Sequence, residues 1–234
     1  MNEQSFVITE KNGILIITMQ AEGNNLMTAK FFEGYEAAME DIEKRAAENT
    51  YRGLIICGGG RHFSVGADVE ALSERSAKEL PELRETGRIP EGHYRQKHFF
   101  TFLNRLPFPA VSVVTGFCIG SGCEIAANCH FRIAEKNARI GQPESTFGIL
   151  PALGGIARTI AHTGLQNAFD IVVSGELFSA DRAAELLWAD EVVGKKAGIA
   201  RAEALIDFIS SSGEEYSPDK AAYFYRRFLE SEAV

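Results

Sequence analysis

The sequence predicts an α/β protein with a helical C-terminal region. Short β-branched runs alternate with amphipathic helical stretches through the first half, several of these runs lead directly into glycines, and helical spacing dominates from Gly154 onward. Strands that alternate with helices through short connections usually pair in parallel. We therefore expect one continuous core that contains parallel strands, followed by helices.

The first half begins with two strands and a helix. The runs at 6–9 and 13–19 flank a Lys-Asn-Gly turn signal, which favours two neighbouring strands. Apolar residues at helical spacing over 26–48 predict an amphipathic helix. The apolar run 53–57 is typical of a buried strand, and three glycines follow it.

The second half contains one more clear strand and then helices. Two prolines precede the apolar run 110–114, which predicts a strand, and the glycine-rich turn 116–122 leads into a helix over 121–128. The stretch 131–141 predicts two short strands around a turn. The remaining helices are predicted over 155–163, 165–173, 180–188, 197–210 and 218–229. Ser179 and Ser217 are candidate N-caps of two of them.

Composition narrows the function classes. The chain has 234 residues and a net charge of −8, with 32 acidic against 24 basic side chains. A nucleic-acid partner needs a basic surface, so this charge argues against one. No apolar run reaches the length of a membrane span and no secretory signal is visible, so we expect a soluble cytoplasmic protein without a membrane partner. The four cysteines form no C-x-x-C pair and are expected to be reduced, buried thiols rather than zinc ligands.

Two strand-to-glycine turns, at 58–72 and 116–126, are the candidate functional motifs. Glycine lets a ligand approach main-chain N–H groups closely, and a helix N-terminus presents unpaired donors. Two such turns that meet would stabilise an anion. The second turn lacks the P-loop lysine, the third glycine of a dinucleotide fingerprint, and the first glycine of a hydrolase elbow around Ser121. Ordinary strand–helix turns remain the alternative interpretation.

The same two segments resemble the signatures of a known family. HFSVGADVEAL and the long stretch PFPAVSVVTGFCIGSGCEIAANCHFRIAEKNARIGQPESTFGILPALGGIAR are similar to those of the enoyl-CoA hydratase/isomerase (crotonase) superfamily. The resemblance extends over about residues 13–195 and is strongest over 107–158. It implies a crotonase-like ββα spiral core over 1–190 and a short C-terminal helical region over 191–234.

The resemblance also implies site residues. It places an oxyanion hole at the backbone N–H groups of Ala67 and Ser121, and two catalytic acids at Glu124 and Glu144. A lone glutamate is more often a solvated carboxylate or a first-turn helix residue, but the matching context of both favours catalysis. The implied substrate-binding residues are Val65, Asp68, Val69 and Gly120, and no metal ligand is implied. His62 and His98 could approach the site, although a hydrogen-bonded or surface histidine is more common than a catalytic one.

These residues imply a lyase that adds water across a 2-enoyl thioester. The substrate would be an acyl-CoA or an acyl-carrier thioester, with no cofactor, and relatives lead us to expect a homotrimer or hexamer. The glutamate pair favours a hydratase over a double-bond isomerase, a decarboxylase or a thioester hydrolase. A non-catalytic assembly subunit is the alternative from another class.

Departures from the family pattern concern coenzyme A. Relatives usually carry a basic residue where this chain has Glu70, and no basic residue lies between Met19 and Lys30. Arg61, Lys30 and the pair Arg226 and Arg227 remain as candidate phosphate partners. The sequence thus leaves open whether the acyl group arrives on coenzyme A or on a carrier.

Overall fold

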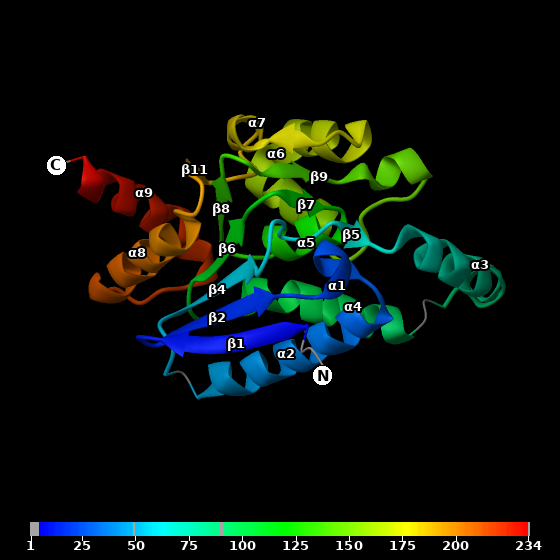
Figure 1. Cartoon of the computed structure of the whole chain (residues 1–234), viewed down its shortest axis with the longest axis horizontal. Helices are drawn as coiled ribbons and strands as arrows, with labels where there is room; N and C mark the ends of the chain where they lie inside the picture. Colours follow the sequence, from blue (N-terminus) through cyan, green and yellow to red (C-terminus); the bar gives the residue numbers. More distant parts are fainter. Residues whose placement is uncertain (1–4, 49, 89–90, 234) are drawn as a thin grey trace.

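A six-stranded sheet forms the centre of the computed structural model, which describes residues 5–48, 50–88 and 91–233 (Figure 1). The first two strands form an antiparallel hairpin, and every later neighbour pairs in parallel. In spatial order the strands are β1 (Phe6–Lys11), β2 (Ile14–Met19), β4 (Gly53–Gly58), β6 (Ala110–Val114), β8 (Phe131–Glu135) and β11 (Glu191–Val193). The predicted α/β class is confirmed.

Short strands that follow the strands of the large sheet build two small sheets. β3 (Leu26–Met27) pairs with β5 (Gly66–Ala67), and β7 (Phe117–Ile119) pairs with β9 (Arg139–Gly141). β10 (Phe178–Ser179) adds to the free edge of β9. Four times, therefore, the chain passes from the large sheet to a small sheet and then into a helix, which is the expected ββα spiral.

Helices cover both faces of the large sheet (Figure 1). α2 and α4 lie on one face, while α8 and α9 lie on the other. The helices are α1 (Glu22–Asn25), α2 (Ala29–Ala47), α3 (Val69–Thr86), α4 (Glu91–Phe102), α5 (Ser121–Ala127), α6 (Gly155–Ser174), α7 (Ala180–Glu185), α8 (Gly198–Ser211) and α9 (Ala221–Glu232), with 3-10 turns η1 (Leu103–Arg105), η2 (Pro143–Phe147) and η3 (Pro218–Lys220).

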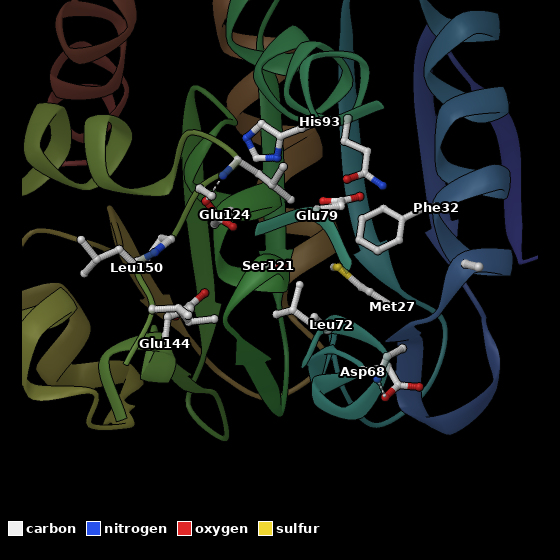
Figure 2. A pocket seen from close by; sticks show the side chains of 18 of the residues that line it. Met27, Phe32, Asp68, Leu72, Glu79, His93, Ser121, Glu124, Glu144 and Leu150 are labelled. Atoms are coloured by element: carbon white, nitrogen blue, oxygen red, sulfur yellow. Dashed lines mark hydrogen bonds between the residues drawn. The ribbon is translucent and has the colours of Figure 1, made fainter. Parts of the chain in front are cut away.

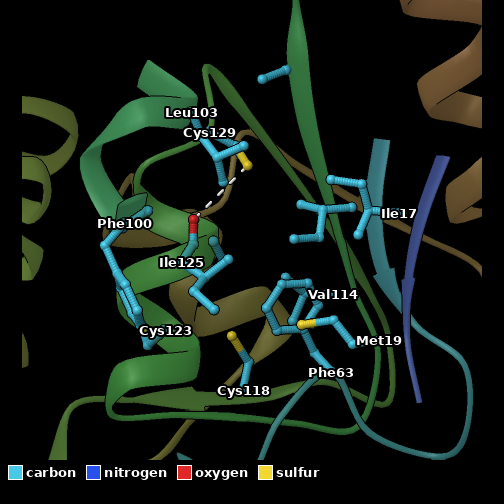
Figure 3. Close-up of a cluster of buried hydrophobic side chains, with 14 of the residues drawn as sticks. Ile17, Met19, Phe63, Phe100, Leu103, Val114, Cys118, Cys123, Ile125 and Cys129 are labelled. Atoms are coloured by element: carbon cyan, nitrogen blue, oxygen red, sulfur yellow. Dashed lines mark hydrogen bonds between the residues drawn. The ribbon is translucent and has the colours of Figure 1, made fainter. Parts of the chain in front are cut away.

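Strand alternation divides the apolar side chains between two cores. In β4, Leu54 and Ile56 face the α2 side, whereas Ile55 packs toward α8 and α9. Successive side chains of a strand point to opposite faces, so a strand covered on both sides is apolar throughout. Figure 3 shows the larger core, where three buried cysteines lie among aliphatic and aromatic side chains. All four cysteines are free.

The structure confirms most predicted elements and corrects two details. Gly164, with φ 75° and ψ 165°, interrupts α6 where the sequence predicts two helices. The Ser179 hydroxyl accepts from the Arg182 N–H and caps α7, as predicted. The predicted cap at Ser217 is wrong, because its side chain makes no capping hydrogen bond and a 3-10 turn follows. Leu26 belongs to β3, so the helix predicted over 26–48 begins later, after Thr28.

The boundary proposed at residue 190 remains a prediction. β11 follows that boundary and pairs in parallel with β8, and α8 and α9 cover the outer face of the same sheet. Within the described residues, no helix is both long enough and apolar enough to cross a membrane.

Candidate active site

The first turn of α5 is built by a strained glycine. Gly120 has φ 53° and ψ −122°, a conformation that only glycine adopts readily. Its carbonyl accepts from the Glu124 N–H (3.0 Å), and its own N–H donates to Gly141 (2.9 Å), so the turn is fixed at both ends. Ser121 is the first residue of the helix, and no carbonyl inside the helix is placed to accept its N–H.

The second glycine turn packs directly against the first. A Cβ added to Gly122 would meet the Cβ of Ser64 at 2.7 Å, so only glycine permits this approach. Ser64 also donates its hydroxyl to the Asn25 carbonyl (2.7 Å) and accepts from the Gly66 N–H (3.1 Å). Gly66, with φ 88°, then leads into Ala67. The two turns predicted from the sequence therefore meet, as an anion site requires.

Asn25 holds the loop before β3 in place, and the sequence prediction missed it. Its side chain is buried, accepts from the Ala21 N–H (2.7 Å) and donates to the Phe63 carbonyl (2.9 Å). Asn25 has a φ of 61°, which asparagine tolerates better than most residues. A buried amide that bonds only main-chain groups aligns β3 beside β5 and thereby positions Ala67.

Glu124 is almost completely buried, with 1% of its surface exposed. Its Oε1 accepts from the N–H groups of Leu153 (2.8 Å) and Gly155 (2.9 Å), at the start of α6. The pKa of this carboxyl is raised to about 8, mainly by burial; the nearby Glu144 also raises the pKa, while the N–H groups of Gly155 and Leu153 lower it. At neutral pH Glu124 is therefore mainly protonated.

Glu144 lies on η2, beside the glycine turn that contains Gly120. A Cβ added to Gly120 would stand 3.2 Å from Glu144 Oε1, so the carboxylate lies directly beside that turn. Its Oε2 is buried without a hydrogen-bond partner among the described residues, and burial raises the pKa of the carboxyl. An unpaired buried oxygen of this kind is costly unless a ligand or water completes it.

These groups line one cavity of about 650 Å³ (Figure 2). Ala67, Ser121, Glu124 and Glu144 all contribute to its wall, together with Asp68. The wall also contains Met27, Ala29, Phe32, Glu33, Glu36, Ala71, Leu72, Glu79, His93, Gln96 and the segment 149–153. The size fits a small-molecule site, because such pockets commonly enclose several hundred cubic ångströms.

Some predicted site residues lie outside this wall. Val65, Val69 and Gly120 are not lining residues, so their contact with a substrate stays a prediction. His62 stacks on Phe117 and accepts from its N–H (2.9 Å), and it does not line the cavity.

The histidine in the cavity wall is a different one. His93 lines the cavity, and nothing in its local sequence predicts that position. His98, considered alongside His62, faces Arg105 and Glu43 and does not line the cavity. In the part of the chain that the structure describes, no group of three His, Cys, Asp or Glu residues is placed to hold a metal ion.

Comparison with known proteins identifies the family. The model of the enoyl-CoA hydratase/isomerase family matches residues 9–212, so the chain belongs to that family. It is 32% identical to the human peroxisomal bifunctional enzyme over 154 residues, covering 66% of this chain and 19% of that protein. It is 28% identical to a probable enoyl-CoA hydratase of Bacillus subtilis over 173 residues, covering 74% and 63%. The chain thus spans less than two thirds of the length of each of these relatives.

Solved structures confirm the crotonase fold. An enoyl-CoA hydratase/isomerase from Xanthobacter autotrophicus Py2 superposes with a TM-score of 0.73 at 24% identity, over 98% of this chain and 81% of that one. At 24% identity, this structural similarity supports the fold and says nothing about the reaction.

Proposed function

We propose that this protein adds water across the double bond of a 2-enoyl thioester carried by coenzyme A or a carrier protein. One observation carries the proposal: two carboxyls, the buried Glu124 and the half-buried Glu144, share a cavity with Ser121, the first residue of α5, and with Ala67. Isomerisation, decarboxylation and thioester hydrolysis need fewer acids, so a pair favours hydration.

The reaction requires an acid, a base and a site for negative charge. The thioester oxygen would lie between the N–H groups of Ala67 and Ser121, where it gains charge as the enolate forms. One carboxyl would take a proton from the attacking water while the other delivers a proton to the α-carbon. Glu124, whose pKa is raised to about 8, holds a proton at neutral pH and so could serve as the acid of the pair.

The burial of Glu124, and the pKa of about 8 that results from it, support this assignment. A carboxyl with a pKa near the working pH transfers protons in either direction at little cost. The Oε2 of Glu144 has no hydrogen-bond donor among the described residues, so the protein itself does not satisfy this oxygen. Because acid, base and oxyanion donors would all come from the chain, the proposed chemistry needs no cofactor.

The test is hydration of crotonyl-CoA. The enoyl absorbance should fall and the product should gain the mass of one water, which a double-bond isomerase or a hydrolase would not produce. Glu144→Gln should lower kcat by about 100-fold or more, the usual contribution of a general acid or base. Glu185→Gln, at an exposed carboxyl on α7, serves as the matched control. A product without added water, or full activity in Glu144→Gln, would exclude the proposal.

We also propose that the chain assembles with copies of itself into a trimer or a pair of trimers. Leu165, Phe169 and Val173 are exposed on α6 at a spacing of four residues, which puts them on one face of the helix. A contiguous apolar face of this kind usually marks an interface.

A further inference from the structure

Ser64 lies between the two halves of the proposed oxyanion hole. It precedes β5, which carries Ala67, and it packs against the first turn of α5, which carries Ser121. Figure 1 shows β5 beside α5. The Ser64 side chain is fully buried and lies outside the cavity wall, so it cannot touch a substrate. Any effect of Ser64 on a bound thioester must therefore pass through its neighbours.

The hydroxyl of Ser64 holds the half that contains Ala67. It donates to the Asn25 carbonyl (2.7 Å) and accepts from the Gly66 N–H (3.1 Å). A hydroxyl has one proton to donate, so these two bonds together fix its orientation. Asn25 immediately precedes β3, and Gly66 is the first residue of β5. The Ser64 oxygen therefore joins the two paired strands between which Ala67 is held.

The main chain of Ser64 and its Cβ hold the half that contains Ser121. The Ser64 N–H donates to the Phe117 carbonyl (2.9 Å), and the Ser64 carbonyl accepts from the Ile119 N–H (3.1 Å). These bonds hold β7, which ends two residues before Ser121. A Cβ added to Gly122 would stand only 2.7 Å from the Ser64 Cβ, so α5 lies as close to Ser64 as glycine allows.

The separation of the two N–H donors therefore depends on this one serine. Oxyanion donors act only when both lie about 3 Å from the oxygen that gains charge, and a misplacement of about 1 Å can cost a large part of the rate. Without the hydroxyl, the Gly66 N–H and the Asn25 carbonyl would lose a partner, and β5 could shift relative to α5. A serine that only stabilises the fold would lower the free energy of unfolding and leave the polarisation of the thioester unchanged.

We propose that Ser64 is a positioning residue that sets the separation of the Ala67 and Ser121 N–H groups, and that it acts on the thioester only through them. This inference rests on the proposed function, since it takes these two N–H groups as the donors to the thioester oxygen.

Infrared difference spectroscopy of bound butyryl-CoA tests the inference without turnover. Butyryl-CoA has no double bond to hydrate, and a ¹³C label at its carbonyl separates the thioester band from the protein bands. A carbonyl that accepts hydrogen bonds absorbs at lower wavenumber. In the wild type, the labelled band should therefore lie at lower wavenumber than in free butyryl-CoA.

Two variants disturb the contact from opposite sides. Ser64→Ala removes the hydroxyl, and Gly122→Ala keeps it but forces α5 away from Ser64. Each should lose most of the band shift, and each should lower kcat for crotonyl-CoA by about 10-fold or more with little change in KM, as expected when an interaction made in the transition state is lost.

Ser112→Ala is the matched control. Ser112 is as fully buried as Ser64, and its hydroxyl donates to the Ala126 and Phe131 carbonyls (3.4 Å each), beyond the first turn of α5. This variant should keep the wild-type band and the wild-type kcat. Circular dichroism and calorimetric binding of butyryl-CoA show that each variant is folded; if Ser64→Ala does not fold, Gly122→Ala alone decides.

The outcomes separate this inference from the proposed reaction. A folded Ser64→Ala or Gly122→Ala that keeps the wild-type band and kcat, or an equal loss in Ser112→Ala, would overturn the inference while crotonyl-CoA hydration stands. A band shift that is lost in the two variants of a protein that does not hydrate crotonyl-CoA would support the inference and exclude the reaction. A wild type that does not bind butyryl-CoA, or binds it without a band shift, would overturn the oxyanion hole and the inference together.

Discussion

Replacing Glu124 by glutamine should make the folded protein more stable at neutral and alkaline pH. Burial raises the pKa of Glu124 from 4.5 to about 8, so the folded state holds this proton more tightly than the unfolded state does. The stability that this group contributes is fully present below pH 4.5 and is lost as the pH rises to 8. At about 1.4 kcal/mol for each pKa unit, the loss is on the order of 5 kcal/mol over that window and about 3 kcal/mol at pH 7.

Glutamine removes this loss and keeps the local hydrogen bonds. Its carbonyl oxygen can accept from the N–H groups of Leu153 and Gly155, as Oε1 of Glu124 does. Urea unfolding of the wild type and of Glu124→Gln between pH 5 and pH 8.5 measures the difference. The free energies of unfolding should be similar at pH 5, and the variant should lead by roughly 3–4 kcal/mol at pH 8.

The control is Glu185→Gln, at an exposed carboxyl, which should follow the wild type at every pH. The reasoning would be refuted if the difference in the free energy of unfolding between Glu124→Gln and the wild type stays constant with pH. A constant difference would mean that the carboxyl of Glu124 has the same pKa in the folded and the unfolded state. Loss of hydration activity in the stabilised variant would show that a titratable carboxyl at this position is kept for catalysis at the expense of stability.

Two further predictions concern the glycine turn and the surface of α6. Gly120→Ala should lower kcat for crotonyl-CoA by about 10-fold or more, because alanine disfavours φ 53° and its Cβ would press on the Glu144 carboxylate. Steady-state kinetics measures this loss, and an unchanged circular dichroism spectrum shows that the variant is folded. Full activity of the variant would contradict the prediction. The side chains of Leu165 and Phe169 are 73% and 60% exposed. The double variant Leu165→Glu and Phe169→Glu should therefore be monomeric by light scattering at concentrations where the wild type is oligomeric. A monomeric wild type would refute the proposed interface.

The sequence predicts the strands and the two glycine turns well because both depend on local chemistry. The runs that become β2, β4 and β6 are buried on both faces, so each is almost continuously apolar and can be recognised in the sequence. Ala67, Ser121, Glu124 and Glu144 were located through a family resemblance, and the structure places all four around one cavity. Their catalytic roles remain a proposal.

The wall of the cavity opposite Glu144 could not be predicted, because it depends on how helices distant in sequence pack together. Nothing in the local sequence of Glu79 or His93 distinguishes them from solvated residues of a charged segment. The start of α2 was misplaced for a different reason. Asn24 and Asn25 adopt positive φ and form a tight turn before β3, and helical spacing of apolar residues conceals such a turn.

The two N–H groups that bind Glu124 belong to the chain that forms the apolar wall of the pocket, so one carboxyl both titrates and anchors residues 149–155. A relative that lost this acid would also lose the tether of the wall, and would need a new acceptor to keep the cavity the same shape. In this chain, the chemistry proposed for Glu124 and the shape of the pocket therefore depend on the same side chain. A change in substrate preference and a change in reaction type can then arise from the same single substitution.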